Sequence, residues 1–374
     1  MKNYSVIAFF LWVPLFISCS GEGPSDDQLI YSNVPEIDFE LIMEAGESEN
    51  YFPAQLNELY VASDGSILVS DWGSVTLEQF SASGEHLQTV ATEGGGPGEL
   101  SSFFFIKDAG QGQLMVEHQG ARRDIFGPDE NSIFRYQSTR STDQNDQYGN
   151  NVIGYRPENE YYVTPRNVIR DIQSLVTNPE DYRSYPIQIA DFNGEIVRDS
   201  LQLLQNPNPH IVMMNGGFRI NTIPYRNTDR FLVRPDGTYL VARPGLSTIE
   251  FYDLNHSLDR TITLDVEDRP VTAEDLDYAF RDTDRDDRRG VEPRVHDLKP
   301  PFLDAWVSEN KIWLHTDNRE EGKEFVILDL QGNPVGRFLL SEFDDVKEII
   351  NNTIYSIHKD PEVGDSIRVY EIAV

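Results

Sequence analysis

Polar and titratable side chains recur at one position of a repeated pattern in this chain. Six residues after the glycine or asparagine of each predicted hairpin turn stand Asp71, His118, Pro165, Arg243, Thr316 and His358. Beside them in the chain are Trp72, Glu117, Arg166, His315 and Asp317. A histidine next to a carboxylate can act as a general base, and a ring of such groups can equally hold a ligand.

Three interpretations of this set stay open. Strand ends meet solvent, so their polarity can be without function. The set can instead form a binding face for a small molecule or a protein. Alternatively the chain is a lyase or hydrolase, with His118, His315 or His358 as the base and Asp71 or Glu117 as the orienting group or metal ligand.

No compact catalytic motif accompanies these residues. The chain has no G-x-S-x-G, no H-E-x-x-H, no Walker-type glycine loop and no C-x-x-C. This favours a binding module over an enzyme and leaves the catalytic residues unknown. We expect no cofactor. A divalent ion such as calcium is suggested only by Asp282 to Asp286, where a solvated charged turn fits better because Asp287 and Pro293 replace the glycine and glutamate of a calcium loop.

A glycine-rich stretch lies beside the same pattern. It comprises Gly94, Gly95, Gly96, Pro97 and Gly98. A strand-like segment at Phe103 to Ile106 follows it, where a phosphate cradle would have a helix. We therefore predict a tight crossing between two sheets.

The charge of the chain restricts its partners. Acidic residues outnumber basic ones by 63 to 31, a formal net charge of −32. Such a surface repels nucleic acids and anionic headgroups, so we expect neither as a partner. The charge either serves solubility or attracts cationic ligands. We expect a monomer.

The N-terminus predicts export. Lys2 precedes an apolar segment, Val6 to Ile17, that has the length of a signal peptide and is too short for a membrane span. The chain's only cysteine, Cys19, follows, and Phe16 to Cys19 resembles a bacterial lipobox. That resemblance implies cleavage after residue 18, lipidation of Cys19 and, with Ser20 after it, an outer-membrane address. Residues 19–34 read as a flexible tether, so the lipid would be the only contact with the membrane.

The elements that must position the polar set are short strands. Turn signals at Asp64-Gly65 and Gln111-Gly112 lie 47 residues apart, the period of a β-propeller blade. Continuing the pattern predicts an all-β fold over residues 35–374, a six-bladed β-propeller with four antiparallel strands in each blade. The third blade is the least regular, with a long polar insertion at residues 166–185.

Two further elements complete the prediction. The last blade lacks one strand, and residues 36–44 alternate in polarity except at Ile42, so we predict that they supply it and close the ring. Thr272 to Arg281 reads as a short helix with Thr272 as N-cap, within an insertion near 272–288. A cover over one end of the ring suits its narrow apolar stripe better than a partner-binding helix.

This combination resembles the secreted bacterial six-bladed β-propeller lipoproteins, which are related to NHL-type propellers. Four stretches carry the resemblance: Gly96-Pro97-Gly98-Glu99, Asp64 to Asp71, Arg269 to Thr272, and Pro300-Pro301-Phe302. The resemblance implies the fold. It assigns no catalytic residue, because propellers host unrelated activities.

Overall fold

The computed structural model describes residues 34–49, 51–118, 122–141, 150–157, 159–165, 182–207, 209–214, 217–319 and 321–374. The predicted signal peptide, Cys19 and almost all of the tether lie outside this set, as does Arg166. Everything below concerns the described residues.

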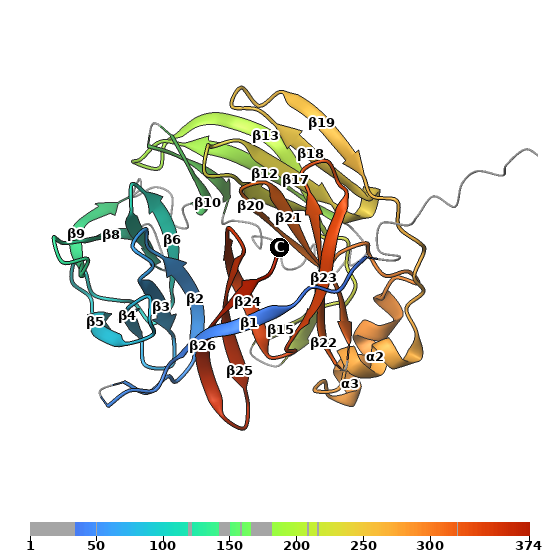
Figure 1. The fold of residues 1–374 in the computed structure, drawn as a ribbon, viewed down its shortest axis with the longest axis horizontal. Helices are drawn as coiled ribbons and strands as arrows, with labels where there is room; N and C mark the ends of the chain where they lie inside the picture. The colour runs from blue at the N-terminus through green and yellow to red at the C-terminus, as the bar shows by residue number, and fades with distance from the viewer. Residues whose placement is uncertain are drawn as a thin grey trace, which may run out of the picture.

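Six antiparallel sheets of four strands stand in a ring (Figure 1). Blade 1 is β2 (Leu56–Val61), β3 (Ile67–Asp71), β4 (Thr76–Phe80) and β5 (His86–Thr92). Blade 2 is β6 (Phe104–Gly110), β7 (Gln113–His118), β8 (Arg122–Pro128) and β9 (Phe134–Ser141). Blade 3 is β10 (Asn150–Arg156), β11 (Glu160–Pro165), β12 (Tyr182–Ala190) and β13 (Ile196–Pro207).

The second half of the ring repeats this order. Blade 4 is β16 (Arg230–Val233), β17 (Tyr239–Arg243), β18 (Thr248–Tyr252) and β19 (Leu258–Thr263). Blade 5 is β20 (Asp304–Ser308), β21 (Lys311–Arg319), β22 (Gly322–Asp329) and β23 (Pro334–Leu340). Blade 6 is β24 (Asp344–Ile350), β25 (Thr353–Asp360), β26 (Gly364–Ile372) and β1 (Phe39–Ala45). The predicted six-bladed propeller is confirmed.

The N-terminal strand closes the ring as predicted. β1 pairs antiparallel with β26, from Phe39 opposite Ile372 to Ala45 opposite Ile367. The register shifts between Leu41 and Met43, so Ile42 is the extra residue of a bulge. This bulge explains why Ile42 breaks the alternation of the strand, and it turns Met43 and Ala45 into the core.

The core is divided among the blade interfaces. Buried apolar residues form one cluster between each pair of neighbouring blades, including blades 6 and 1. Between blades 1 and 2, for example, Leu68 and Leu77 pack with Phe104 and Phe126. Each cluster needs both of its blades, so the ring is stable only when all interfaces form together.

Insertions gather at one end of the ring. A hairpin of β14 (His210–Met214) and β15 (Gly217–Asn221) precedes blade 4. Helices α2 (Ala273–Ala279) and α3 (Arg285–Val291) precede blade 5 and lie near β22 in Figure 1. Thr272 caps α2 and forms a capping box with Asp275, as predicted. None of the described helices has the length and apolarity needed to cross a bilayer.

The closing strand provides a direct test of the ring. Deleting residues 35–45 exposes the edge of β26 and removes Met43 and Ala45 from the cluster between blades 6 and 1. We expect the cooperative thermal transition, followed by circular dichroism, to be lost. Deleting residues 20–33 should leave the melting temperature unchanged. If both deletion variants unfold at the same melting temperature, β1 does not close the ring.

Candidate ligand-binding face

One end of the ring carries the insertions and the predicted polar residues together. We call it the capped face. It holds the starts of the first strands, the ends of the second strands and the links between blades, together with α2, α3 and the β14–β15 hairpin. The predicted residues Asp71, Glu117, His118, Arg243, His315, Asp317 and His358 all lie at this end of their second strands, and Trp72 follows directly.

Asp71 organises the backbone at the top of blade 1. Its carboxylate is fully buried and accepts hydrogen bonds from the hydroxyl of Tyr51 at 2.9 Å and from the amides of Ala54 and Gln55 at 2.9 and 2.8 Å. Burial alone would raise its pKa, but these donors hold the pKa of Asp71 below its ordinary value. Trp72 donates its indole N–H to the carbonyl of Phe104, so it joins blades 1 and 2.

His118 and Glu117 are held within blade 2. Both are buried. Nε2 of His118 lies 3.0 Å from Oδ2 of Asp124, and Oε1 of Glu117 accepts a hydrogen bond from Nε of Arg123 at 3.0 Å. The histidine therefore meets its carboxylate within its own blade and not across the ring.

The glycine-rich loop is the crossing from β5 to β6 that its composition predicts. Its own acidic residue takes the place an anion would have, because the amide of Gly96 donates to Oε2 of Glu99 at 2.7 Å. Gly98 has φ +77°, and a Cβ there would stand 2.8 Å from the ring of Tyr136. Its amide donates to Asp124, so the loop and His118 share one carboxylate.

Arg243 and His358 belong to separate networks. Arg243 pairs with Asp229 at 2.7 Å and with Glu250 at 3.0 Å in blade 4. In blade 6, Nδ1 of His358 lies 3.0 Å from Oδ1 of Asp344. Arg243 also donates to the carbonyl of Leu203 in β13, so it joins blades 3 and 4, whereas His358 meets its carboxylate within blade 6.

His315 and Asp317 lie at the top of blade 5. His315 stacks on Phe325, with 5.2 Å between ring centroids, and its Nε2 lies 3.1 Å from the side-chain oxygen of Asn318. Burial, with the positive charge of Lys323 nearby, lowers the pKa of His315 to about 4. Asp317 lines a cavity, as Arg243 does in blade 4.

The predicted histidines therefore lie in three different blades, each with its own partner. Among the residues the structure describes, no group of three histidine, cysteine, aspartate or glutamate side chains is arranged to hold a metal ion. The set shares one face of the molecule and does not converge on one point. Arg166 lies outside the described residues.

Cavities open on the same face. The largest described cleft, of about 840 Å³, lies between α2 and the tops of blades 5 and 6. It is lined by seven carboxylates, two bases, Tyr278, Asn318, Phe343 and Pro361. We call it the acidic cleft. The carboxylates are those of Glu274, Asp275, Asp277, Asp282, Asp317, Glu321 and Glu342, and the bases are Arg281 and Lys299.

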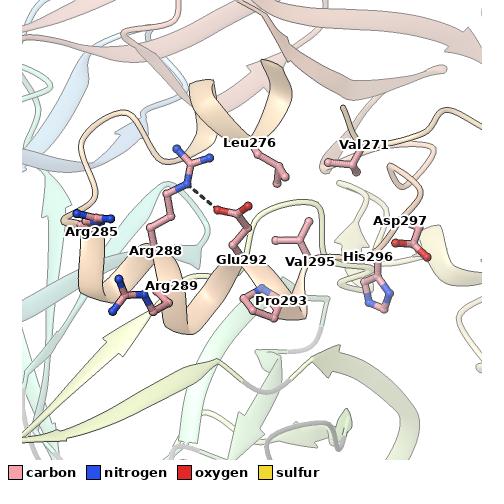
Figure 2. A pocket seen from close by; sticks show the side chains of 10 residues that line it. All are labelled: Val271, Leu276, Arg285, Arg288, Arg289, Glu292, Pro293, Val295, His296 and Asp297. Atoms are coloured by element: carbon pink, nitrogen blue, oxygen red, sulfur yellow. Dashed lines mark hydrogen bonds and ion pairs between the residues drawn. The ribbon is translucent and has the colours of Figure 1, made fainter. Parts of the chain in front are cut away.

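A second cavity, of about 720 Å³, is lined by α3, by the segment that follows it and by Leu276 of α2 (Figure 2). Arg285, Arg288 and Arg289 of α3 stand along it, with Val271, Leu276 and Val295 among its lining. Figure 2 shows Arg288 turned to Glu292, to which its Nε donates at 2.6 Å. Smaller cavities of about 500 and 400 Å³ follow at the top of blade 4, the larger of them lined by Arg243.

Ion pairs dock the helices over the acidic cleft. Nζ of Lys299 lies 2.6 Å from Asp275 of α2 and 2.9 Å from Asp317 of β21. On the other side of the cleft, Glu342 accepts from Tyr278 at 3.0 Å and pairs with Arg281 at 2.6 Å. Of these residues the strand-end pattern included only Asp317. Asp275, Tyr278, Arg281 and Lys299 lie in an insertion that does not repeat, and Glu342 lies in the link from β23 to β24. The helix predicted from Thr272 to Arg281 was a signal for Asp275, Tyr278 and Arg281 alone.

Comparison with known proteins supports the fold and no particular activity. No protein-family model matches the chain, and no curated protein matches it. A Bacteroides fragilis protein that is predicted to be exported shares 9% identity at a TM-score of 0.52, covering 91% of this chain and 98% of its own. Virginiamycin B lyase from Staphylococcus aureus has 9% identity, a TM-score of 0.45 and coverage of 89% and 99%. A PQQ-bound aldose sugar dehydrogenase from Streptomyces coelicolor has 12% identity, a TM-score of 0.46 and coverage of 91% and 99%.

The inner strands hold a second group of titratable residues. Glu58 of β2 pairs with Lys107 of β6 at 2.9 Å. Farther along, Glu348 of β24 lies near Asp108, and burial together with this neighbouring charge raises the pKa of Glu348 to about 7. Between about pH 4.5 and 7 the folded chain therefore holds a proton that the unfolded chain releases, so this group lowers stability as the pH rises.

Replacing Glu348 tests whether ionisation of this residue lowers the stability of the fold. In Glu348→Gln the penalty for ionising the group disappears, so we expect the free energy of unfolding at pH 8 to rise by about 1–3 kcal/mol over wild type. At pH 4.5 the two proteins should differ little. Urea unfolding at both pH values measures the effect, with Glu130→Gln on the exposed surface as control. If the free energy of unfolding changes between pH 4.5 and pH 8 by the same amount in Glu348→Gln as in wild type, the prediction is wrong.

Proposed function

We propose that this chain is an exported, lipid-anchored β-propeller that binds a small molecule or a protein partner at its capped face. The observation that carries the proposal is the position of the cavities. The four described cavities of about 400 to 840 Å³ all open at this end, while one of about 170 Å³ lies on blade 4 near its opposite end. Concave polar surfaces of this size suit ligand binding.

The remaining strand-end residues support this role indirectly. Asp71, His118, Arg243 and His358 fix the ends of the strands and the links from which the face is built. A rigid frame under variable insertions is the usual arrangement of a binding site on a regular scaffold. The enzyme alternative gains no such support, because its candidate bases are held apart in separate blades.

The export part of the proposal rests on the N-terminal sequence. The apolar leader, Cys19 and the polar residues after it fit an outer-membrane lipoprotein whose propeller is held near the membrane by a tether. The Bacteroides protein of the same fold is predicted to be exported too.

Lipidation gives a first test. When the full-length chain is expressed with a palmitate analogue that carries an alkyne, we expect the label on the mature protein and its recovery in the membrane fraction. Cys19→Ala should abolish both, while Ser20→Ala should retain the label. A labelled Cys19→Ala protein would refute this anchor.

The binding face gives the second test. Extract from the native organism, added to the purified chain, should raise its melting temperature. Glu321→Trp places a large side chain in the acidic cleft and should abolish the rise, whereas Gln331→Trp, at the opposite end of blade 5, should not. Binding in this cleft would be contradicted if the rise in melting temperature were lost only in Gln331→Trp. It would also be contradicted if the rise were the same in wild type and both variants.

A further inference from the structure

The acidic cleft has more negative charge than its own bases neutralise. Arg281 is committed to Glu342, and Lys299 to Asp275 and Asp317. Glu274 and Glu321 line the cleft, are exposed, and form no hydrogen bond or ion pair with another described residue. The cleft therefore presents these two carboxylates without a base, in a lining that also includes Tyr278 and Phe343. Such a lining attracts cations.

The innermost part of the cleft already holds an ammonium group. Nζ of Lys299 lies between the carboxylates of Asp275 and Asp317, at 2.6 and 2.9 Å. It also lies 5.5 Å from the ring centroid of Tyr225, within cation–π range. Two carboxylates and an aromatic ring are a chemical environment suited to an alkylammonium ion.

Tyr225 adds an independent observation. Only 4% of its surface is exposed, yet its hydroxyl makes no hydrogen bond with another described residue. Burial, with the charges of Asp275 and Asp317 next, raises the pKa of Tyr225, so the two cleft carboxylates act on this phenol. A buried hydroxyl without a partner costs stability, so a donor supplied beside Lys299, where this ring lies, would stabilise the protein.

We infer that the acidic cleft binds a linear alkylpolyamine, with one ammonium group replacing that of Lys299 between Asp275 and Asp317. Because a free ammonium ion is not tethered to the backbone as Lys299 is, it can shift towards Tyr225 and donate to its oxygen as well. Further ammonium groups along the ligand lie against Glu274 and Glu321 at the outer rim. The inference rests on the proposed function and names its ligand class.

Spermidine is the probe, and the full-length chain in neutral detergent is the protein. Isothermal titration should show one site. The double variant Glu274→Gln/Glu321→Gln should bind about fivefold more weakly, since two exposed ion pairs are removed. The charge-matched control Glu130→Gln/Glu195→Gln, on exposed surfaces of blades 2 and 3, should bind like wild type. Equal weakening in both doubles would show non-specific screening and overturn the inference.

Tyr225→Phe separates binding from folding. It removes only the hydroxyl, which has no partner to lose, so the melting temperature should stay the same or rise. Spermidine should bind roughly fivefold more weakly to this variant. Unchanged spermidine affinity would remove Tyr225 from the site and overturn the inference.

Lys299→Met tests the exchange. Leaving Asp275 and Asp317 without their ammonium should lower the melting temperature, and spermidine or butylammonium should restore it more strongly than either raises that of wild type. Tetramethylammonium, which cannot donate hydrogen bonds, should restore it less. If neither amine stabilises Lys299→Met beyond wild type, or if calcium displaces spermidine at equal concentration, the alkylammonium site is wrong.

These outcomes separate the ligand class from the proposed function. If spermidine fails while Glu321→Trp still blocks stabilisation by native extract, the cleft binds a ligand of another class. If Glu321→Trp has no effect on extract either, the proposed function itself fails at this site.

Discussion

The pairing of β1 with β26 is the interaction on which the structure depends. It joins residues 39–45 to residues 367–372 and so completes the one blade that the chain does not build from consecutive strands. Without it, β26 would be an open edge and the cluster between blades 6 and 1 would lose its N-terminal side chains. Because each of the other five blade interfaces has a cluster of the same kind, closing the last interface stabilises the whole ring.

A closed ring leaves only its two ends free to vary. The end opposite the capped face consists of tight hairpin turns, such as Asp64-Gly65 and Asp236-Gly237, whose glycines have φ of +84° and +81°. The insertions therefore lie at the capped face. There Leu276 of α2 and its C-cap Phe280 pack with Ile223 and Val291 in a small apolar cluster. Contacts of Lys299, Arg281 and Tyr278 join the same helix to blades 5 and 6.

This mode of docking gives the face its chemistry. In a chain of net charge −32, the bases at the cap are used to hold acidic elements together, and carboxylates remain in excess around the cleft. An ammonium ion that enters can therefore take the place of the Lys299 ammonium group at little electrostatic cost, because the carboxylates that surround it are already in position. The same charge makes binding sensitive to salt.

Most of the fold could be predicted from the sequence, because turn chemistry and strand alternation are local signals. The hairpin glycines marked the blades, and the alternation from Ile37 to Met43 identified the closing strand. The candidate site was less accessible. Counting from the turns predicted that Asp71, His118 and His358 share one end of the ring, but only the structure shows that Asp124 and Asp344 already pair with the two histidines.

The acidic cleft could not be predicted, because it joins three regions distant in the sequence. Asp275 comes from the helical insertion, Asp317 from β21 and Glu342 from the link to β24, and no repeat relates them. Tyr225 comes from a fourth region, the segment after β15, and only its missing hydrogen bond distinguishes it from an ordinary buried tyrosine.

A crystal structure of the chain grown with spermidine tests this account most directly. The account predicts density for an ammonium group between Asp275 and Asp317, within hydrogen-bonding distance of the Tyr225 hydroxyl, with Lys299 moved aside. Lys299 still between the two carboxylates, with spermidine absent from the cleft, would contradict it.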